Sequence, residues 1–287
     1  MNSTTVSAVR VAAIGLLTSA GVPSPEVDAD LLIGHVLGLS RGAVQAASVT
    51  DREMAPDAEE LTIALVARRA AREPLQHITG VAPFRSIELA VGPGVFVPRP
   101  ESEQVAQFAI DELKSSASPS PLAVDLGTGS GAIALALATE VPHATVFGVE
   151  NSAPAFVWTA RNFGTLAPDN ATAVFADLAT CLPELDGRVS VVVSNPPYIP
   201  DAAIPRDPEV RLFDPPAALY GGADGLDVVR RVSHTAWRLL HPGGTLVIEH
   251  GELQGADIRS LLADDGWRAA ATHPDFLGRD RATTALR

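Results

Sequence analysis

Cysteine and lysine are nearly absent from this chain of 287 residues. The single cysteine, Cys181, excludes an intramolecular disulfide and a cysteine-rich zinc site. Lys114 is the only lysine, so arginine supplies nearly all of the positive charge. The seven histidines are scattered along the sequence without the spacing of metal ligands. We therefore expect no bound metal.

Positive charge and long apolar runs are also scarce. The formal net charge is −13, whereas nonspecific binding to nucleic acid normally requires a basic surface. No segment approaches the ~20 uninterrupted apolar residues that a membrane-spanning helix needs. The apolar run Val11–Leu17 directly follows Arg10 and precedes no convincing signal-cleavage site. We expect a cytoplasmic protein that binds neither membranes nor nucleic acid directly, and we expect a monomer.

Hydrophobic periodicity divides the chain into three expected parts. Residues 1–73 repeat apolar side chains at helical spacing and predict a small helical domain. Residues 74–100 contain short β-type runs between glycines and prolines, which predict a β-hairpin linker. These runs are Ile78–Gly80, Ile87–Val91 and Val95–Val97. Residues 101–287 form the third part, which we expect to be the catalytic domain.

Strands and helices alternate through this third part with short connections. The expected strands are Leu122–Leu126, Thr145–Val149, Ala171–Phe175, Val189–Val193 and Gly244–Glu249, followed by a final short pair. The expected helices are Glu101–Leu113, Ala132–Thr139, Ala153–Phe163, Asp227–Leu240 and Leu253–Ala263. This alternation predicts an α/β fold with a doubly wound, mostly parallel sheet. Ligands of such sheets bind at the carboxyl ends of the strands.

A glycine-rich loop, Asp125–Gly131, joins the first of these strands directly to a helix. Glycines let the chain turn sharply and let a ligand approach the backbone, and Glu150, at the end of the next strand, can accept ribose hydroxyls. The pattern also fits a nicotinamide-dinucleotide fingerprint. However, the Asp125 carboxylate can receive the ammonium group of S-adenosylmethionine, whereas it would repel a pyrophosphate. The expected donor-binding residues are Asp125, Gly127, Thr128, Gly129, Ser130, Gly131, Glu150, Asp177, Leu178 and Asn195.

Two of these residues, Asp177 and Leu178, follow the third strand. In this topology we expect the carboxylate to face the exocyclic nitrogen of the adenine and the leucine to lie against its ring. Asp177 could equally be an ordinary acidic residue at a strand end that contacts no ligand, because the sequence would be the same.

The tetrapeptide Asn195–Tyr198, Asn-Pro-Pro-Tyr, follows a buried strand. An amide nitrogen is a poor nucleophile because its lone pair is delocalised into the carbonyl group. An enzyme can methylate it by accepting both N–H groups in hydrogen bonds, so that the lone pair points at a sulfonium methyl group. The Asn195 side-chain oxygen and the Pro196 carbonyl supply these acceptors, and Pro197 adds no N–H donor. We expect Tyr198 to lie flat against the planar amide, and orientation with electrostatic stabilisation to provide the catalysis. Asn195, Pro196 and Tyr198 are the expected catalytic residues, and the whole tetrapeptide is the expected substrate site.

Together these motifs resemble the protein glutamine N5-methyltransferases that act on peptide chain release factors, the PrmC or HemK family. The resemblance covers almost the whole chain. Besides the glycine loop, it rests on Glu73–Gly80, Phe96–Glu103, Val193–Ile199, Asp214–Leu219 and Gly221–Asp227.

The resemblance implies a helical amino-terminal domain, a hairpin linker and a Rossmann-like class I methyltransferase domain whose last strand is antiparallel. It implies S-adenosylmethionine as donor, S-adenosylhomocysteine as product and the glutamine of a Gly-Gly-Gln motif in release factors as acceptor. By position, Gly127–Gly131, Glu150, Leu178 and Asn195 would contact the donor. Glu150 stands where aspartate is common, and Leu178 stands where a larger side chain often meets the adenine.

Three other functions fit parts of the same pattern. A related enzyme methylates a glutamine of a ribosomal protein and shares the tetrapeptide. Adenine-N6 DNA methyltransferases face the same nitrogen chemistry, but the acidic net charge and the lack of a basic recognition segment oppose that reading. A noncatalytic donor-binding protein would have no need of the complete Asn-Pro-Pro-Tyr.

Overall fold

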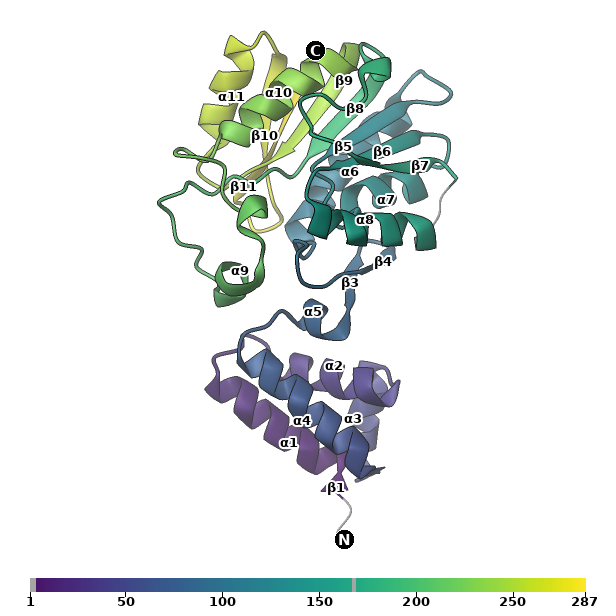
Figure 1. The fold of residues 1–287 in the computed structure, drawn as a ribbon, viewed down its shortest axis with the longest axis vertical. Helices are drawn as coiled ribbons and strands as arrows, with labels where there is room; N and C mark the ends of the chain where they lie inside the picture. Colours follow the sequence, from purple (N-terminus) through teal and green to yellow (C-terminus); the bar gives the residue numbers. More distant parts are fainter. Residues whose placement is uncertain (1–3, 167–168) are drawn as a thin grey trace. The chain divides into compact units, whose positions relative to one another are not determined.

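A computed structural model describes residues 4–166 and 169–287 (Figure 1). Contacts within it define two compact units. The helical unit consists of the residues up to Gly80 together with Arg206–Phe213, and the sheet unit consists of Val81–Pro205 with Asp214–Arg287. In the described part of the chain, no helix is long and apolar enough to cross a membrane.

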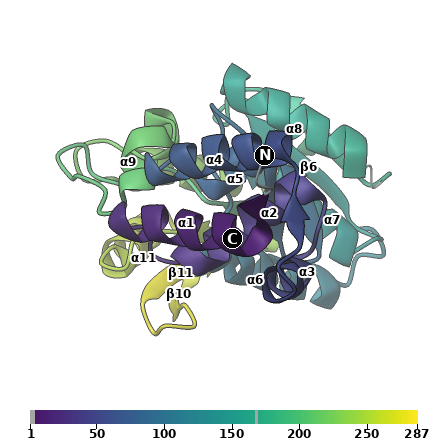
Figure 2. The ribbon, with the colours of Figure 1, turned by 90° about the horizontal axis from the view of Figure 1, so that it is seen from below.

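The helical unit consists mainly of α-helices (Figures 1 and 2). They are α1 (Val6–Ser19), α2 (Pro25–Leu37), α3 (Arg41–Val49), α4 (Pro56–Ala70), α5 (Leu75–Thr79) and α9 (Pro208–Phe213), with β1 (Thr4–Thr5) pairing antiparallel to β2 (Glu53–Met54). Helices α2 and α4 each begin with proline, whose fixed φ suits the first helical turn. Leu17, Leu32 and Val66 from α1, α2 and α4 bury their side chains in one apolar cluster.

The short helix α9, which our sequence reading did not predict, is held in the helical unit by ion pairs. Arg69, 6% exposed, donates to Asp28 at 2.7 Å and to Glu209 at 2.9 Å. Arg72 also donates to Glu209, at 2.7 and 2.9 Å. Burial alone would raise the pKa of Glu209, but hydrogen bonds from Arg72 and Arg69 outweigh it and hold that pKa below its ordinary value.

The sheet unit contains a seven-stranded sheet in the order β10-β11-β9-β8-β5-β6-β7. Its strands are β5 (Leu122–Leu126), β6 (Thr145–Glu150), β7 (Ala171–Phe175), β8 (Val189–Ser194), β9 (Leu240–Glu249), β10 (Arg268–Pro274) and β11 (Asp280–Leu286). The pairs from β7 to β9 are parallel, whereas the last strand, β11, runs antiparallel to β9 and β10. This confirms the predicted Rossmann-like methyltransferase sheet.

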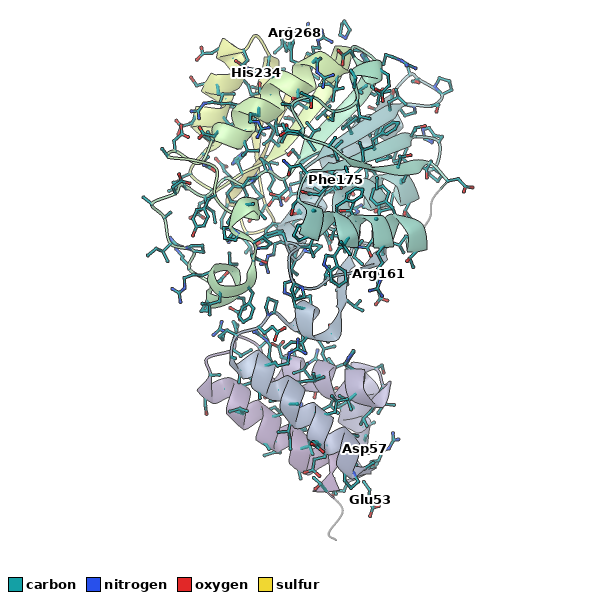
Figure 3. All side chains as sticks on the ribbon, in the orientation of Figure 1. Glu53, Asp57, Arg161, Phe175, His234 and Arg268 are labelled. Atoms are coloured by element: carbon teal, nitrogen blue, oxygen red, sulfur yellow. The ribbon has the colours of Figure 1, made fainter. Side chains whose placement is uncertain are left out.

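Helices cover both faces of this sheet (Figure 1). They are α6 (Pro100–Ser115), α7 (Ala132–Glu140) and α8 (Ala153–Leu166) on one face, with α10 (Asp227–Leu239) and α11 (Gly255–Asp264) on the other. In β8, Val191 and Val193 belong to the first apolar layer and Val192 to the second. Strands buried on both faces are uniformly apolar for this reason. Side chains fill the space between the sheet and each helical layer (Figure 3).

The segment before α6 differs from the prediction. Residues Ile78 and Thr79, expected in a strand, lie in helix α5, which ends where Gly80 adopts a φ of 76°. Val95–Val97 forms no strand either. The hairpin pairs β3 (Val81–Phe84) with β4 (Ile87–Ala90). Beta-branched residues made the helix resemble a strand, and the partner strand β3 carried too weak a pattern to be recognised.

Candidate functional site

The glycine loop and the Asn-Pro-Pro-Tyr segment follow two neighbouring parallel strands of the sheet unit. Strand β5 ends at Leu126 and strand β8 at Ser194. The buried Ser194 hydroxyl donates to the Leu126 carbonyl oxygen at 2.6 Å. This bond joins the two strand ends, so the residues that follow them, Gly127 and Asn195, begin side by side at the carboxyl edge of the sheet.

Three glycines give the loop its shape. Gly127, Gly129 and Gly131 have φ angles of 75°, 57° and 91°, a region that side-chain-bearing residues rarely adopt. A Cβ atom added at Gly127 or Gly129 would have no neighbour within 4 Å among the described residues, so the backbone here is open to a ligand. Gly131 has a different function, because an added Cβ would lie 2.8 Å from the Phe163 ring. The predicted turn residues Thr128 and Ser130 are themselves buried.

Asp125 is 1% exposed, and its two carboxylate oxygens have different surroundings. One oxygen accepts from the Thr128 hydroxyl at 2.6 Å and from the Ala134 N–H at 3.1 Å, which fixes the loop onto α7. The other oxygen, Oδ1, has no protein partner in the described chain. Burial raises the pKa of Asp125 to about 7, and the nearby Glu150 charge adds to this.

Glu150, expected to hold a ribose, also braces the loop. Its Oε2 accepts from the Gly129 N–H at 2.9 Å, while its Oε1 accepts from the Asn151 and Ser152 N–H groups at 3.0 and 2.8 Å. A carboxylate has about four lone-pair sites, so further acceptance remains available. Sequence reasoning missed this second function because a backbone partner leaves no residue pattern.

The predicted adenine-facing pair lies on the loop after β7. The Asp177 side chain is about half exposed, and it accepts from the Ala179 N–H at 2.8 Å and from Arg231 at 2.6 Å. The hydrogen bond from Ala179, with that from Arg231, holds the pKa of Asp177 below its ordinary value despite an opposing effect of desolvation. Leu178 is buried in the apolar layer that also contains Val149. Its side chain thus packs in the layer under α10.

The Asn-Pro-Pro-Tyr segment leaves the sheet with Pro196 buried and Asn195, Pro197 and Tyr198 partly exposed. The Asn195 Nδ2 donates to the Ser102 hydroxyl at 3.1 Å. Burial raises the pKa of Tyr198 to about 12, so its phenol stays neutral at physiological pH.

Two further polar residues stand behind Asn195 that sequence reasoning did not assign. The Ser102 hydroxyl, on α6, donates to Glu249 Oε2 at 2.6 Å. Burial raises the pKa of Glu249, at the end of β9, to about 7. Ser102 lies within Phe96–Glu103, a stretch that supported only the family resemblance, and this was the one available signal.

The glycine-rich segment Gly221–Asp227 packs against the backbone at the end of the tetrapeptide, Pro197 and Tyr198. A Cβ atom at Gly221 would lie 2.5 Å from the Pro197 carbonyl oxygen, and one at Gly225 would lie 2.3 Å from the Tyr198 carbonyl oxygen. Gln254 also donates to the Tyr198 carbonyl, at 2.9 Å. Glycine is therefore required here by close backbone approach.

An ion pair fixes the chain that precedes α6. Arg99 donates to Asp214 Oδ2 at 2.7 Å, and its guanidinium lies 5.0 Å from the centre of the Phe96 ring. Asp214 is buried and its pKa is raised by burial, against the effect of Arg99. The pair joins the Phe96–Glu103 stretch to the Asp214–Leu219 stretch.

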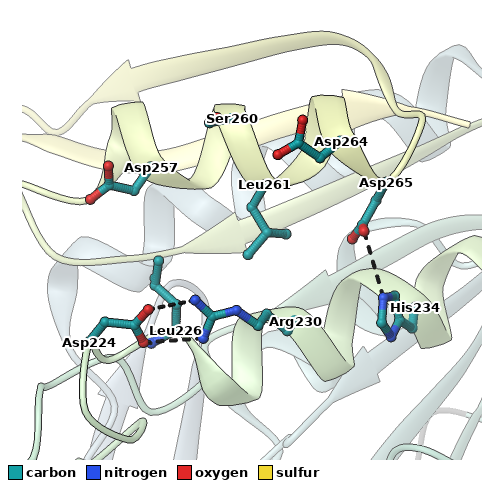
Figure 4. A pocket seen from close by; sticks show the side chains of 9 residues that line it. All are labelled: Asp224, Leu226, Arg230, His234, Asp257, Ser260, Leu261, Asp264 and Asp265. Atoms are coloured by element: carbon teal, nitrogen blue, oxygen red, sulfur yellow. Dashed lines mark hydrogen bonds and ion pairs between the residues drawn. The ribbon is translucent and has the colours of Figure 1, made fainter.

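A separate hollow lies between α10 and α11 (Figure 4). Asp224 pairs with Arg230 along its wall, and Asp265 lies 3.6 Å from His234. None of the residues that line it belongs to the predicted site. Among residues 4–166 and 169–287, no three metal-ligating side chains gather.

Known proteins resemble the chain over nearly its full length. Family models of the PrmC N-terminal domain and of the methyltransferase small domain match residues 9–80 and 86–213. A Streptomyces coelicolor protein named release factor glutamine methyltransferase is 49% identical over 271 residues, which cover 94% of this chain and 93% of the relative. A 4-amino-L-phenylalanine/4-methylamino-L-phenylalanine methyltransferase of Streptomyces pristinaespiralis is 39% identical over 282 residues, covering 96% and 92%.

Solved structures share the fold. The hMettl16 catalytic domain, in complex with MAT2A 3′UTR hairpin 6, aligns with a TM-score of 0.55 and 16% identity, covering 77% of this chain and 81% of that one. At this level of identity the likeness concerns the fold alone.

Proposed function

The chain belongs to the release factor glutamine methyltransferase family, and we propose that it transfers a methyl group from S-adenosylmethionine to the side-chain amide nitrogen of a release factor glutamine. The observation that carries the proposal is the bond between Ser194 and Leu126. It sets a glycine loop suited to the donor beside a tetrapeptide suited to an amide. A dehydrogenase would need the first feature and have no need of the second.

The glycine loop fits S-adenosylmethionine. The open backbone at Gly127 and Gly129 gives a ligand room. Oδ1 of Asp125, which has no partner among the described residues, suits an ammonium group. We propose that Glu150 holds the ribose, that Thr128, Ser130 and Gly131 shape the loop, and that Asp177 and Leu178 border the adenine. When bound, the donor supplies an electrophilic methyl group on a sulfonium and leaves as S-adenosylhomocysteine. The proposed reaction uses no metal ion.

The tetrapeptide orients the acceptor. Asn195 Oδ1 and the Pro196 carbonyl oxygen each accept one N–H of the glutamine amide, which turns the nitrogen lone pair toward the methyl group. Tyr198, as a neutral phenol, lies against the amide plane, and Pro197 keeps the segment rigid. These fixed dipoles stabilise the positive charge that develops on nitrogen as the N–CH₃ bond forms and the sulfonium C–S bond breaks. The methylated nitrogen then loses one of its two protons to solvent, which leaves a neutral N-methyl amide.

The glutamine of a Gly-Gly-Gln motif in a release factor is the substrate that we propose, with the cytoplasm as location and a monomer as the working form. We also propose residues 1–73 as the docking domain, 74–100 as a linker and 101–287 as the catalytic domain. The Streptomyces pristinaespiralis relative, by its name, acts on an amine attached to an aromatic ring. Such an amine presents the same delocalised lone pair, so small aromatic amines are a competing substrate class.

A methyl-transfer assay with four parallel substrates tests the proposal. The full-length protein and S-adenosylmethionine are offered an intact release factor, a ribosomal protein, duplex DNA and 4-amino-L-phenylalanine. We expect mass spectrometry to find one methyl group on the Gly-Gly-Gln glutamine and none on a factor with alanine there. Methylation of any of the other three substrates, with none on the release factor, would refute the assignment.

Asn195→Ala tests the mechanism separately. We expect turnover to fall roughly 10²–10³-fold, as for loss of one preorganised polar group at a reacting centre, with donor affinity retained in calorimetry. Asn195→Asp should also be poor, because it changes the charge of the site and the carboxylate must be desolvated when the substrate occupies the pocket. Near-normal turnover in Asn195→Ala would show that another group orients the amide.

A further inference from the structure

Three polar side chains from separate elements form a hydrogen-bonded row that leads into the sheet unit. Asn195 Nδ2 donates to Ser102 Oγ at 3.1 Å, and Ser102 Oγ donates to Glu249 Oε2 at 2.6 Å. Ser102 and Glu249 are 4% and 2% exposed. Burying a serine and a carboxylate costs free energy that an apolar pair would not. The row therefore points to a function beyond stability.

The chemistry of the row fixes which way the Asn195 amide faces. A serine hydroxyl carries one proton, and an ionised carboxylate only accepts hydrogen bonds. Where Glu249 is ionised, above its raised pKa of about 7, Ser102 donates its one proton in the hydrogen bond to Glu249 and can only accept from Asn195. The NH₂ group of Asn195 must then face Ser102, and Oδ1 faces away from it.

We propose that Ser102 and Glu249 are positioning residues that hold the Asn195 carboxamide in the one orientation able to accept a substrate N–H. This inference rests on the proposed function. If the amide turned over, it would present its NH₂ group, which cannot accept an N–H. The row also connects Asn195 to a negative charge, and hydrogen bonds in a chain polarise one another. Oδ1 thereby becomes a better acceptor as positive charge develops on the substrate nitrogen.

An isosteric pair of variants at Ser102 tests the inference. Threonine keeps the hydroxyl and valine removes it at nearly the same volume, so any strain from the added methyl group is common to both. We expect Ser102→Val to lower kcat about tenfold to a hundredfold, the range for a lost hydrogen bond to a charged group. Ser102→Thr should restore most of kcat, and both variants should bind S-adenosylmethionine as the wild type does.

Glu249→Gln separates orientation from charge. Glutamine keeps an oxygen that can accept from Ser102 but removes the negative charge at the end of the row. We expect a fall in kcat smaller than that of Ser102→Val, with donor affinity unchanged. A kcat equal to that of the wild type would remove Glu249 from the inference.

Ser233→Val is the matched control. Ser233, on α10 of the same unit, is also buried and donates to a carboxylate, Asp265, at 2.6 Å. Its loss should lower the melting temperature and leave kcat unchanged. Equal kcat in Ser102→Val and wild type, or equal impairment of the threonine and valine variants, would overturn the inference. A wild-type enzyme that binds the donor but methylates none of the four substrates would instead overturn the proposed function.

Discussion

Two buried carboxylates in the sheet unit, Asp125 and Glu249, have pKa values raised to about 7 by burial. Between the ordinary carboxylate range and pH 7, the folded protein retains protons that the unfolded chain has lost. The free energy of unfolding therefore decreases as the pH rises through this window. Burial of each carboxylate therefore lowers the stability of the protein in this window, and a functional use is the reason to expect such groups.

We expect Asp125 to couple donor binding to a proton. The donor's ammonium group favours the ionised carboxylate, so affinity for S-adenosylmethionine should increase as the pH rises through about 7. Calorimetry just below this pH, in buffers of different ionisation enthalpy, should detect proton release on binding. Asp125→Asn should remove the release, and Glu249→Gln should keep it. A wild-type protein that releases no proton would show that Asp125 does not meet the ammonium group.

The elements of the sheet unit were largely predictable, whereas those set by distant partners were not. Strands β5 and β7 begin and end at the predicted residues, because buried parallel strands are apolar runs between turns. Helix α5 was mistaken for a strand because Ile78 and Thr79 favour strands locally. Helix α9 was not predicted: a proline and an acidic residue begin it, but the helix is short and is held by Arg69 and Arg72, far away in the sequence.

The same distinction applies to the candidate site. The glycine loop and Asn195–Tyr198 could be recognised because each is contiguous and carries its chemistry in its own residues. The positions of Ser102 and Glu249 could not be recognised from the sequence. These two residues act together only through a hydrogen bond between separate elements, which no sequence pattern reveals. The bracing of the loop by Glu150 was missed for the same reason.

At Gly225, we expect alanine to disturb the tetrapeptide. Its φ is 79°, and an added Cβ would lie 2.3 Å from the Tyr198 carbonyl oxygen. Gly225→Ala should therefore displace Tyr198 and reduce kcat. Gly243→Ala is the control, because Gly243 has a φ of 85° and, in the part of the chain that the structure describes, no atom lies within 4 Å of the added Cβ. It should cost only the backbone strain, about 1 kcal/mol. Equal kcat in the two variants would show that the close contact does not shape the site.

For the molecule as a whole, the open question is how one protein glutamine is chosen among many. A site for one planar amide cannot distinguish them, and a single loop buries little area beside the ~1,600 Å² of a standard protein interface. The helical unit contains none of the predicted catalytic residues. We therefore expect it to dock the protein substrate.

Deletion of residues 1–73 tests this docking function. Glu209→Gln is included, because otherwise α9 would keep a carboxylate without Arg69 and Arg72. We expect KM for the intact factor to rise roughly tenfold or more, equivalent to about 1.4 kcal/mol of lost binding. KM for a short Gly-Gly-Gln peptide should change little, and unchanged donor affinity would verify that the sheet unit is folded. Equal efficiency toward the intact factor before and after deletion would refute the docking function.

The membership of α9 in the helical unit also has a consequence for synthesis on the ribosome. Domains generally fold as units while the chain emerges, amino-terminal parts first. Residues up to Gly80 leave the ribosome early, but Arg206–Phe213 follows only after strand β8 has been made. Until then Arg69 and Arg72 cannot form their ion pairs with Glu209. The helical unit is thus completed only when the tetrapeptide of the sheet unit has already emerged.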